Sequence, residues 1–248
     1  MLTSISLFIF LSLALGACGA SNTSQTLTVY AAASLTDAFT EIGVAFEASH
    51  PDVTVAFNFG GSQNLRTQIE QGAPVDVFAS ANTKEMDTLV EQNLVGADVP
   101  KIFLTNRLVV ILPKDNPAGI ASLEDLGKPN LKLVLAAEEV PAGRYARQVL
   151  ENINSMFGVD YKGRVLANVV SNEDNIRQAV TKGQLGEADA SIVYVSDAVA
   201  VAGVQRIEMP ADVNVVAEYP IAPLPSSSNS ELAHEFIAYI LSPEGQAT

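Results

Sequence analysis

The sequence predicts an α/β protein of two lobes, each with a mostly parallel sheet flanked by helices. Apolar stretches of strand length alternate with amphipathic helical stretches along most of the chain, which is the pattern of repeated strand–helix units. Segments marked by proline and glycine near Pro113 and between Pro210 and Pro220 interrupt this pattern. We interpret them as the places where the chain leaves one lobe and returns to it, so that two strands cross between the lobes.

Residues 1–17 are predicted to be a lipoprotein signal peptide. Ile5–Ala17 is apolar but shorter than the roughly 20 residues that span a bilayer. It leads into Leu-Gly-Ala-Cys18, the form of a bacterial lipoprotein processing site, although MLTS lacks the usual positive charge of a signal peptide. Cys18 is the only cysteine of the 248-residue chain and the predicted site of lipidation; the alternative is an ordinary buried thiol. Residues 18–26 are predicted to be a flexible tether.

The predicted strands share an apolar run, or an alternation of apolar and polar residues, between turn signals. In chain order they are Leu27–Ala33, Val53–Phe59, Val75–Ser80, Arg107–Leu112, Leu131–Ala136, Arg164–Val170, Ala188–Val195, Val204–Met209 and Tyr219–Leu224.

Most of the predicted helices begin directly after a strand, at a residue type that favours a helix N-terminus. They begin at Ser34, at Ser62 after Gly60-Gly61, at Asn82, at Ser122, at Pro141 (a long helix to about Phe157), within Ser171–Asp174 and at Ser196, and the last helix is Ser230–Leu241.

The junction at Ser34 predicts a site for an anion. Ser34 ends an apolar run and precedes Asp37 by three residues, which is an N-terminal capping signal. A strand that enters a helix in this way leaves free backbone N–H groups at the carboxyl edge of the sheet, where open α/β sheets bind their ligands. One serine cap is usually structural, but several such junctions together favour anion binding. The others at or just beyond strand ends are Ser62, Ala142, the turn 171–176 and Tyr194.

Composition and motifs argue against nucleic acid as a partner and against an enzyme. The net charge of −14 disfavours binding to nucleic acid or to an anionic membrane surface. His50 and His234 are isolated and are interpreted as surface or packing residues. The chain has no His-Glu-x-x-His, no Gly-x-Ser-x-Gly and no Gly-x-x-x-x-Gly-Lys motif, so an enzyme acting on a small acidic substrate would lack a base.

The donor groups at these junctions suit a fully deprotonated oxyanion. Hydroxyl and N–H donors contribute roughly 1.5–3 kcal/mol for each hydrogen bond to a charged group. About six such bonds make micromolar to nanomolar affinity possible after the costs of association and desolvation. Phosphate is less suitable because its retained proton needs an acceptor.

The motifs AAASLTDAF, QIEQGAPVDVFASAN, VPAGRYA and SIVYVSDA resemble those of the periplasmic molybdate-binding proteins of ABC importers. The resemblance extends from about Leu27 to Ser242. It implies a type II periplasmic-binding-protein fold with residues 27–109 and 216–248 in one lobe and 110–215 in the other. It also implies a protein outside the cytoplasm that captures molybdate or tungstate, needs no cofactor and serves an ABC permease and its ATPase. Nothing in the sequence suggests more than a monomer, so a monomer is expected.

The resemblance further implies that the oxyanion is held by uncharged donors, with no protein ligand bonded directly to molybdenum. Carried over by motif, these donors are the hydroxyls of Ser34, Ser62 and Tyr194 and the backbone N–H groups of Ala142 and Ile176. The loop Gly60-Gly61-Ser62-Gln63 has fewer serines than the family pattern.

Three alternatives stay open at this stage. Sulfate is the closest rival ligand, and a sensor module with the same lobes is a rival function. Arg144 follows Gly143 at a predicted helix start and is a candidate cationic ligand; we expect instead that it faces solvent or pairs with Glu138 or Glu139. Glu173 and Asp174 lie at the start of a predicted helix, where negative charge interacts favourably with the helix dipole, and they are expected to point away from the ligand.

Overall fold

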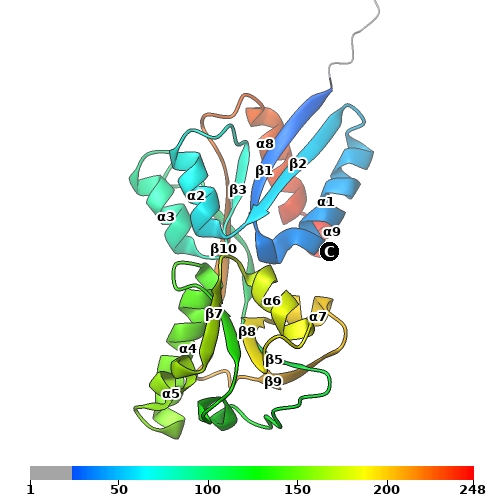
Figure 1. The fold of residues 1–248 in the computed structure, drawn as a ribbon. Helices are drawn as coiled ribbons and strands as arrows, with labels where there is room; N and C mark the ends of the chain where they lie inside the picture. Colours follow the sequence, from blue (N-terminus) through cyan, green and yellow to red (C-terminus); the bar gives the residue numbers. More distant parts are fainter. Residues whose placement is uncertain (1–23) are drawn as a thin grey trace, which may run out of the picture.

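The computed structural model describes residues 24–248, so the predicted signal peptide and Cys18 lie outside the described residues. The described chain forms two lobes, one above the other in Figure 1, each built on a five-stranded sheet. The predicted two-lobed α/β architecture is therefore confirmed. No helix among these residues has both the length and the apolar character needed to cross a bilayer.

Lobe 1 contains the N-terminal and C-terminal parts of the described chain, residues 24–106 and 217–248, with strand order β2-β1-β3-β10-β4. Helices α2 and α3 cover one face of its sheet and α1 and α8 the other (Figure 1). Its elements are β1 (Gln25–Ala32), η1 (Ala33–Leu35), α1 (Thr36–Ser49), β2 (Val53–Gly60), α2 (Ser62–Glu70), β3 (Val77–Ala79), α3 (Thr83–Glu91), β4 (Lys101–Asn106), β10 (Ala217–Pro223), α8 (Ser230–Leu241) and α9 (Pro243–Gln246).

Lobe 2 contains residues 108–208, with strand order β7-β6-β8-β5-β9. Its elements are β5 (Leu108–Pro113), η2 (Glu124–Gly127), β6 (Leu133–Ala136), α4 (Pro141–Phe157), α5 (Tyr161–Ala167), β7 (Val169–Glu173), α6 (Ile176–Gln184), β8 (Ala190–Tyr194), α7 (Val195–Ala200) and β9 (Val204–Glu208).

The two crossing connections explain why each sheet is mixed rather than mostly parallel. In lobe 1, β1 pairs in parallel with β2 and β3, whereas β10 pairs antiparallel with β3 and β4. Lobe 2 repeats this arrangement, with β5 antiparallel to β8 and β9. The antiparallel strands are those that join the lobes. Only Arg107 separates β4 from β5, so Leu108 and Val109 belong to lobe 2 and not, as predicted, to lobe 1.

Four further sequence predictions are wrong in detail. Residues 161–167 form α5, so only the end of the predicted strand Arg164–Val170 is extended. Lys101–Asn106 is a strand that the sequence pattern did not indicate. The predicted tether ends too late, because Gln25 and Thr26 already pair with β2. The cap predicted within Ser171–Asp174 is Asn175, whose side chain accepts a hydrogen bond from the N–H of Gln178 at 3.2 Å.

In the core of lobe 1, aromatic side chains of α1 and α8 pack against each other next to the turn that joins β1 to α1. Phe39 and Phe46 of α1 are buried and lie 6.4 and 5.1 Å from the ring of Phe236 on α8. Full burial of such side chains stabilises the fold by roughly 1.5–3 kcal/mol each. Because α1 and α8 are packed together in this way, the turn between β1 and α1 has a rigid support.

Candidate functional site

A small cavity lies between the lobes at the ends of β1, β2, β6 and β8 and contains about 200 Å³ of empty space, part of it open to solvent. The room inside it is far smaller than that of pockets for drug-sized ligands, so it suits a small ion. None of the described residues that line it has a charged side chain. They are Ala32, Ala33, Ser34, Gly60, Gly61, Ser62, Ala81, Val140, Pro141, Ala142, Asn175, Ile176 and Tyr194.

The structure therefore brings all the predicted site residues to one cavity, three from lobe 2 and two from lobe 1. Ala142 and Ile176 lie in the first turns of α4 and α6, where backbone N–H groups have no carbonyl partner within the helix. The positive ends of these helices face the same space as Ser62 at the start of α2. The arrangement favours a bound anion without a positively charged side chain.

Gly143 allows the first turn of α4 to approach β6 closely. A Cβ atom at this position would lie 1.9 Å from the carbonyl oxygen of Ala137 and 2.3 Å from that of Ala136. Any larger residue would push the helix away from the strand end. The close approach sets the position of the Ala142 N–H at the cavity.

Ser62 presents a donor to the cavity because its oxygen already accepts a bond. Its side chain is buried, and the backbone N–H of Ala81 donates to Ser62 Oγ at 3.0 Å. The hydroxyl hydrogen is then the part of the group that is free to turn toward an anion.

Ser34 lies in the cavity wall but does not cap α1, contrary to the sequence prediction. It is the middle residue of η1, and the N-cap residue of α1 is Leu35, with no side-chain cap hydrogen bond. The 3₁₀ turn between β1 and α1 displaces the helix start by two residues. Ser34 Oγ instead forms a hydrogen bond with Tyr219 Oη at 3.0 Å.

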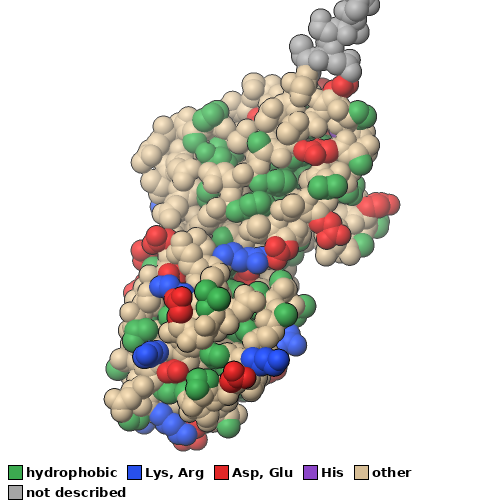
Figure 2. All heavy atoms as spheres, turned by 45° about the vertical axis from the view of Figure 1, so that its right-hand side comes forward, with side chains coloured by type: hydrophobic (Ala, Val, Ile, Leu, Met, Phe, Trp, Pro, Cys, Tyr) green, Lys and Arg blue, Asp and Glu red, His purple; other side chains and the backbone are tan. Residues whose placement is uncertain are grey.

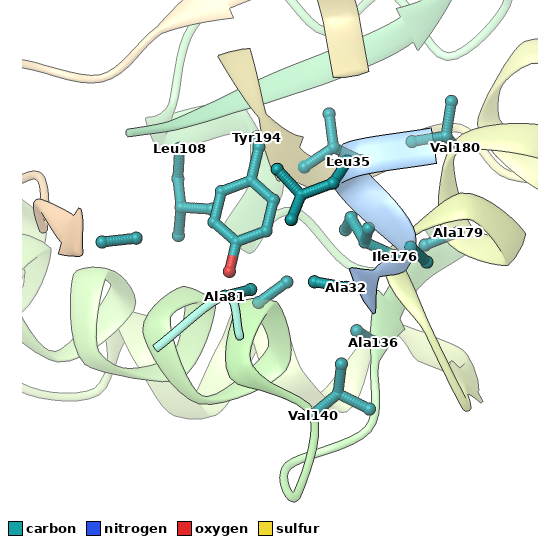
Figure 3. Packing of buried hydrophobic residues seen from close by; sticks show 14 of the residues in the cluster. Ala32, Leu35, Ala81, Leu108, Ala136, Val140, Ile176, Ala179, Val180 and Tyr194 are labelled. Carbon is teal, nitrogen blue, oxygen red and sulfur yellow. The ribbon is translucent and has the colours of Figure 1, made fainter. Parts of the chain in front are cut away.

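The Tyr194 hydroxyl is a buried polar group without a partner. Its oxygen has no hydrogen bond of good geometry among the described residues, and the side chain is 1% exposed. Figure 3 shows the hydroxyl directed toward Ala81 and Ala32. Burial, and to a smaller extent the neighbouring Tyr219, raises the pKa of Tyr194, so the hydroxyl keeps its proton. An unpaired buried hydroxyl costs about 1–3 kcal/mol, which a bound acceptor would offset.

Arg144 is not part of the cavity wall. Its Nη2 lies 3.6 Å from Oε1 of Glu85 in lobe 1 and donates to the carbonyl oxygen of Glu139 at 3.4 Å. Glu85 also pairs with Arg66, whose Nε is 2.8 Å from Oε2. The expectation that Arg144 pairs with a carboxylate is confirmed, but Glu85 across the interface takes the role expected of Glu138 or Glu139.

Arg177 of α6 forms a second ion pair between the lobes. Its Nη2 lies 2.5 Å from Oδ2 of Asp37, and its Nε donates to the carbonyl oxygen of Ala33 at 3.3 Å. Figure 2 shows basic and acidic side chains adjacent where the lobes meet. A neutral contact supports the same interface, since Gln63 donates to the carbonyl oxygen of Asp174 at 3.2 Å. The charged groups near the cavity are thus paired with one another outside it.

Asp197 on α7 is a buried carboxylate behind this interface. Its Oδ1 lies 3.3 Å from Nε of Arg177, but neither oxygen has a hydrogen bond of good geometry within the described residues. Burial raises the pKa of Asp197 to about 7, and Asp37 adds to the shift while Arg177 opposes it. The carboxyl group therefore titrates close to neutral pH.

Glu173 is turned away from the cavity, as expected. Its carboxylate accepts hydrogen bonds from Lys182 at 2.7 Å and from Ser171. Burial by itself would raise the pKa of Glu173, but these hydrogen bonds outweigh it and the pKa is lowered. Asp174 is also absent from the cavity wall; it meets lobe 1 through its carbonyl group.

Several residues of the site were not singled out from the sequence as primary candidates. Ala81 follows β3 directly and could have been found by the same strand-end argument. Asn172, Asn175 and Gln63 are polar residues beside the predicted donors and could be expected to reach the site, and of these three Asn175 lines the cavity. Tyr219 and Arg177 reach the site only through the packing of segments that are far apart in the chain, and no local pattern marks them.

Comparisons with known proteins agree with the fold. Residues 27–248 match the model of the family described as bacterial extracellular solute-binding protein. The molybdate-binding protein ModA of Mycobacterium tuberculosis is 39% identical over 229 residues, covering 92% of this chain and 84% of the relative.

Two solved structures are also similar. A substrate-binding domain assigned to a molybdenum ABC transporter of Clostridium difficile superposes with a TM-score of 0.67 at 32% identity, covering 90% of this chain and 95% of that one. The sulfate-binding protein SubI of Mycobacterium tuberculosis superposes with a TM-score of 0.78 at 19% identity, covering 89% and 83%. This second likeness concerns the fold alone. The predicted periplasmic-binding-protein fold is confirmed.

The raised pKa of Asp197 predicts a defined pH dependence of stability. The folded protein keeps a proton on this group up to about pH 7, whereas in the unfolded chain the group has the ordinary aspartate pKa of 3.8. Its contribution to stability therefore falls as the pH rises from about 4 to 7 and stays low above that. Asp197→Asn should raise the ligand-free Tm more at pH 8 than at pH 5. Equal differences at both pH values, by calorimetry, would contradict the assignment.

Proposed function

The chain belongs to the family of bacterial extracellular solute-binding proteins, and we propose that it captures molybdate or tungstate between its lobes and delivers the anion to an ABC transporter. The observation that carries this proposal is the cavity wall, in which hydroxyl and backbone N–H donors converge while the nearby charges pair with each other. The relative from Mycobacterium tuberculosis with a molybdate-binding name supports the choice of ligand.

In this proposal the hydroxyls of Ser34 and Ser62 bind the anion from lobe 1. The N–H groups of Ala142 and Ile176 and the Tyr194 hydroxyl bind it from lobe 2. An anion that touches both lobes binds the closed form better than the open one, so it shifts the population toward closure. The chain crosses between the lobes at Arg107 and again between β9 and β10. These two connections would change conformation when the lobes rotate toward each other. The transporter would respond to closure, with no chemical step on the ligand and no cofactor.

The proposal extends to location and partners. The Leu-Gly-Ala-Cys18 sequence supports a lipid-anchored protein outside the cytoplasm, with the membrane contacted only through the anchor. Its partners would be a permease and its ATPase, and the protein would act as a monomer. Sulfate stays the main rival ligand: it is smaller than molybdate, so it could not reach all of these donors at once.

Ligand-dependent stabilisation tests the choice of anion. Molybdate or tungstate at 100 times its Kd should add about 2.7 kcal/mol to the free energy of unfolding. For a domain of this size that raises Tm by about 5–10 °C. Thermal-shift measurements with molybdate, tungstate, sulfate and phosphate at equal concentration compare the ligands directly. A shift with sulfate equal to or larger than the shift with molybdate would contradict the proposal.

Removal of single donors tests the position of the site. Ser34→Ala and Tyr194→Phe should each weaken molybdate binding about 10- to 100-fold, since each removes a hydrogen bond to a charged ligand. Arg144→Ala is the matched control: Glu85 keeps Arg66 as its partner, so the loss should be at most about fivefold. Titration calorimetry gives the three affinities. If the Arg144 variant lost more affinity than the other two, the ligand would depend on a cation.

A further inference from the structure

Behind the cavity wall, the Ser34 hydroxyl has a partner that does not reach the cavity itself. Tyr219 on β10 is fully buried and is absent from the residues that line the cavity, whereas Ser34 is half-buried and lines it. Ser34 Oγ and Tyr219 Oη are 3.0 Å apart, and either oxygen could be the donor. The direction of this bond decides which part of the Ser34 hydroxyl faces a ligand.

An oxyanion without protons fixes that direction. Such a ligand accepts hydrogen bonds only, so Ser34 must point its hydrogen into the cavity and Tyr219 must then donate to Ser34 Oγ. Tyr219 always has a proton to give, because burial raises its pKa. Ser62 has the same arrangement, with the Ala81 N–H as the group that donates to its oxygen. Each serine of the cavity thus has a protein donor behind it.

We propose that Tyr219 is a positioning residue that keeps the Ser34 hydroxyl as a donor and so favours fully deprotonated oxyanions over those that retain a proton. This inference rests on the proposed function. A hydrogen phosphate ion needs an acceptor in the site, and the hydroxyl oxygens of Ser34 and Ser62 each have one of their two acceptor positions taken, by Tyr219 and by the N–H of Ala81, which makes them poorer acceptors for a ligand. Without the Tyr219 hydroxyl, the Ser34 hydroxyl can rotate and accept a hydrogen bond from the ligand.

The surroundings of Tyr219 make its hydroxyl separable from its ring. The ring makes edge contacts with Tyr194 across the lobe interface, at 5.8 Å, and with Phe103 of lobe 1, at 6.4 Å between centroids. Phenylalanine preserves both contacts. Tyr219→Phe therefore removes the hydrogen bond and leaves the packing of β10 in place.

The test is the ratio of affinities for molybdate and phosphate, measured by titration calorimetry with the sodium salts at a pH where phosphate retains one proton. Tyr219→Phe should weaken molybdate binding about tenfold. Phosphate binding should stay the same or become tighter, so the ratio falls at least about tenfold. Sulfate, which carries no proton, should respond as molybdate does.

Two further variants separate positioning from a general structural effect. Tyr161→Phe removes a buried hydroxyl that donates to the Leu123 carbonyl in lobe 2, away from the cavity, and should leave the ratio unchanged. Ser34→Ala with Tyr219→Phe should bind molybdate no more weakly than Ser34→Ala alone, because Tyr219 acts through Ser34. Melting curves without ligand establish that each variant is folded.

An unchanged ratio in Tyr219→Phe, or losses that add in the double variant, would overturn the inference while the parent still binds molybdate. If the parent binds none of the three anions, the proposed function fails and the inference fails with it.

Discussion

The site depends on one physical constraint: a buried anion must be stabilised without a buried counter-charge. Burial of an unpaired charge is costly, and hydrogen-bond donors directed at the charge offset that cost. Here the donors come from helix N-termini and from hydroxyls whose oxygens are already engaged, as in Ser62. No single strand–helix junction offers enough of them. The two lobes are needed because the donors must surround the ion.

The same constraint explains where the charges lie. With a net charge of −14, the chain has no general attraction for an anion, and recognition is local. The cations near the site are neutralised across the lobe interface, Arg177 by Asp37 and Arg144 by Glu85. These pairs hold the lobes together around the cavity without entering it. The two tyrosines at the interface differ from each other. The Tyr194 hydroxyl has no partner of good geometry, whereas the Tyr219 hydroxyl forms a hydrogen bond with Ser34.

Much of this could be predicted from the sequence, because strand–helix alternation and strand-end residues are local features. All the predicted donors line the same cavity. The failures have physical causes. The apolar stretch 164–170 fits a helix or a strand equally well in periodicity, and packing decides. Ser34 has a capping sequence, but its hydroxyl bonds to a residue 185 positions away. The ion pair of Arg177 with Asp37 likewise depends on closure of the lobes, which no sequence window contains.

The central claim is that uncharged donors from both lobes hold the anion. A crystal structure of the protein with tungstate tests it most directly, since the anomalous signal of tungsten locates the ion. We expect one peak in the cavity, with oxygens in hydrogen-bond contact with Ser34, Ser62, Ala142, Ile176 and Tyr194. A peak elsewhere, or an arginine or lysine side chain in contact with the ion, would contradict the claim.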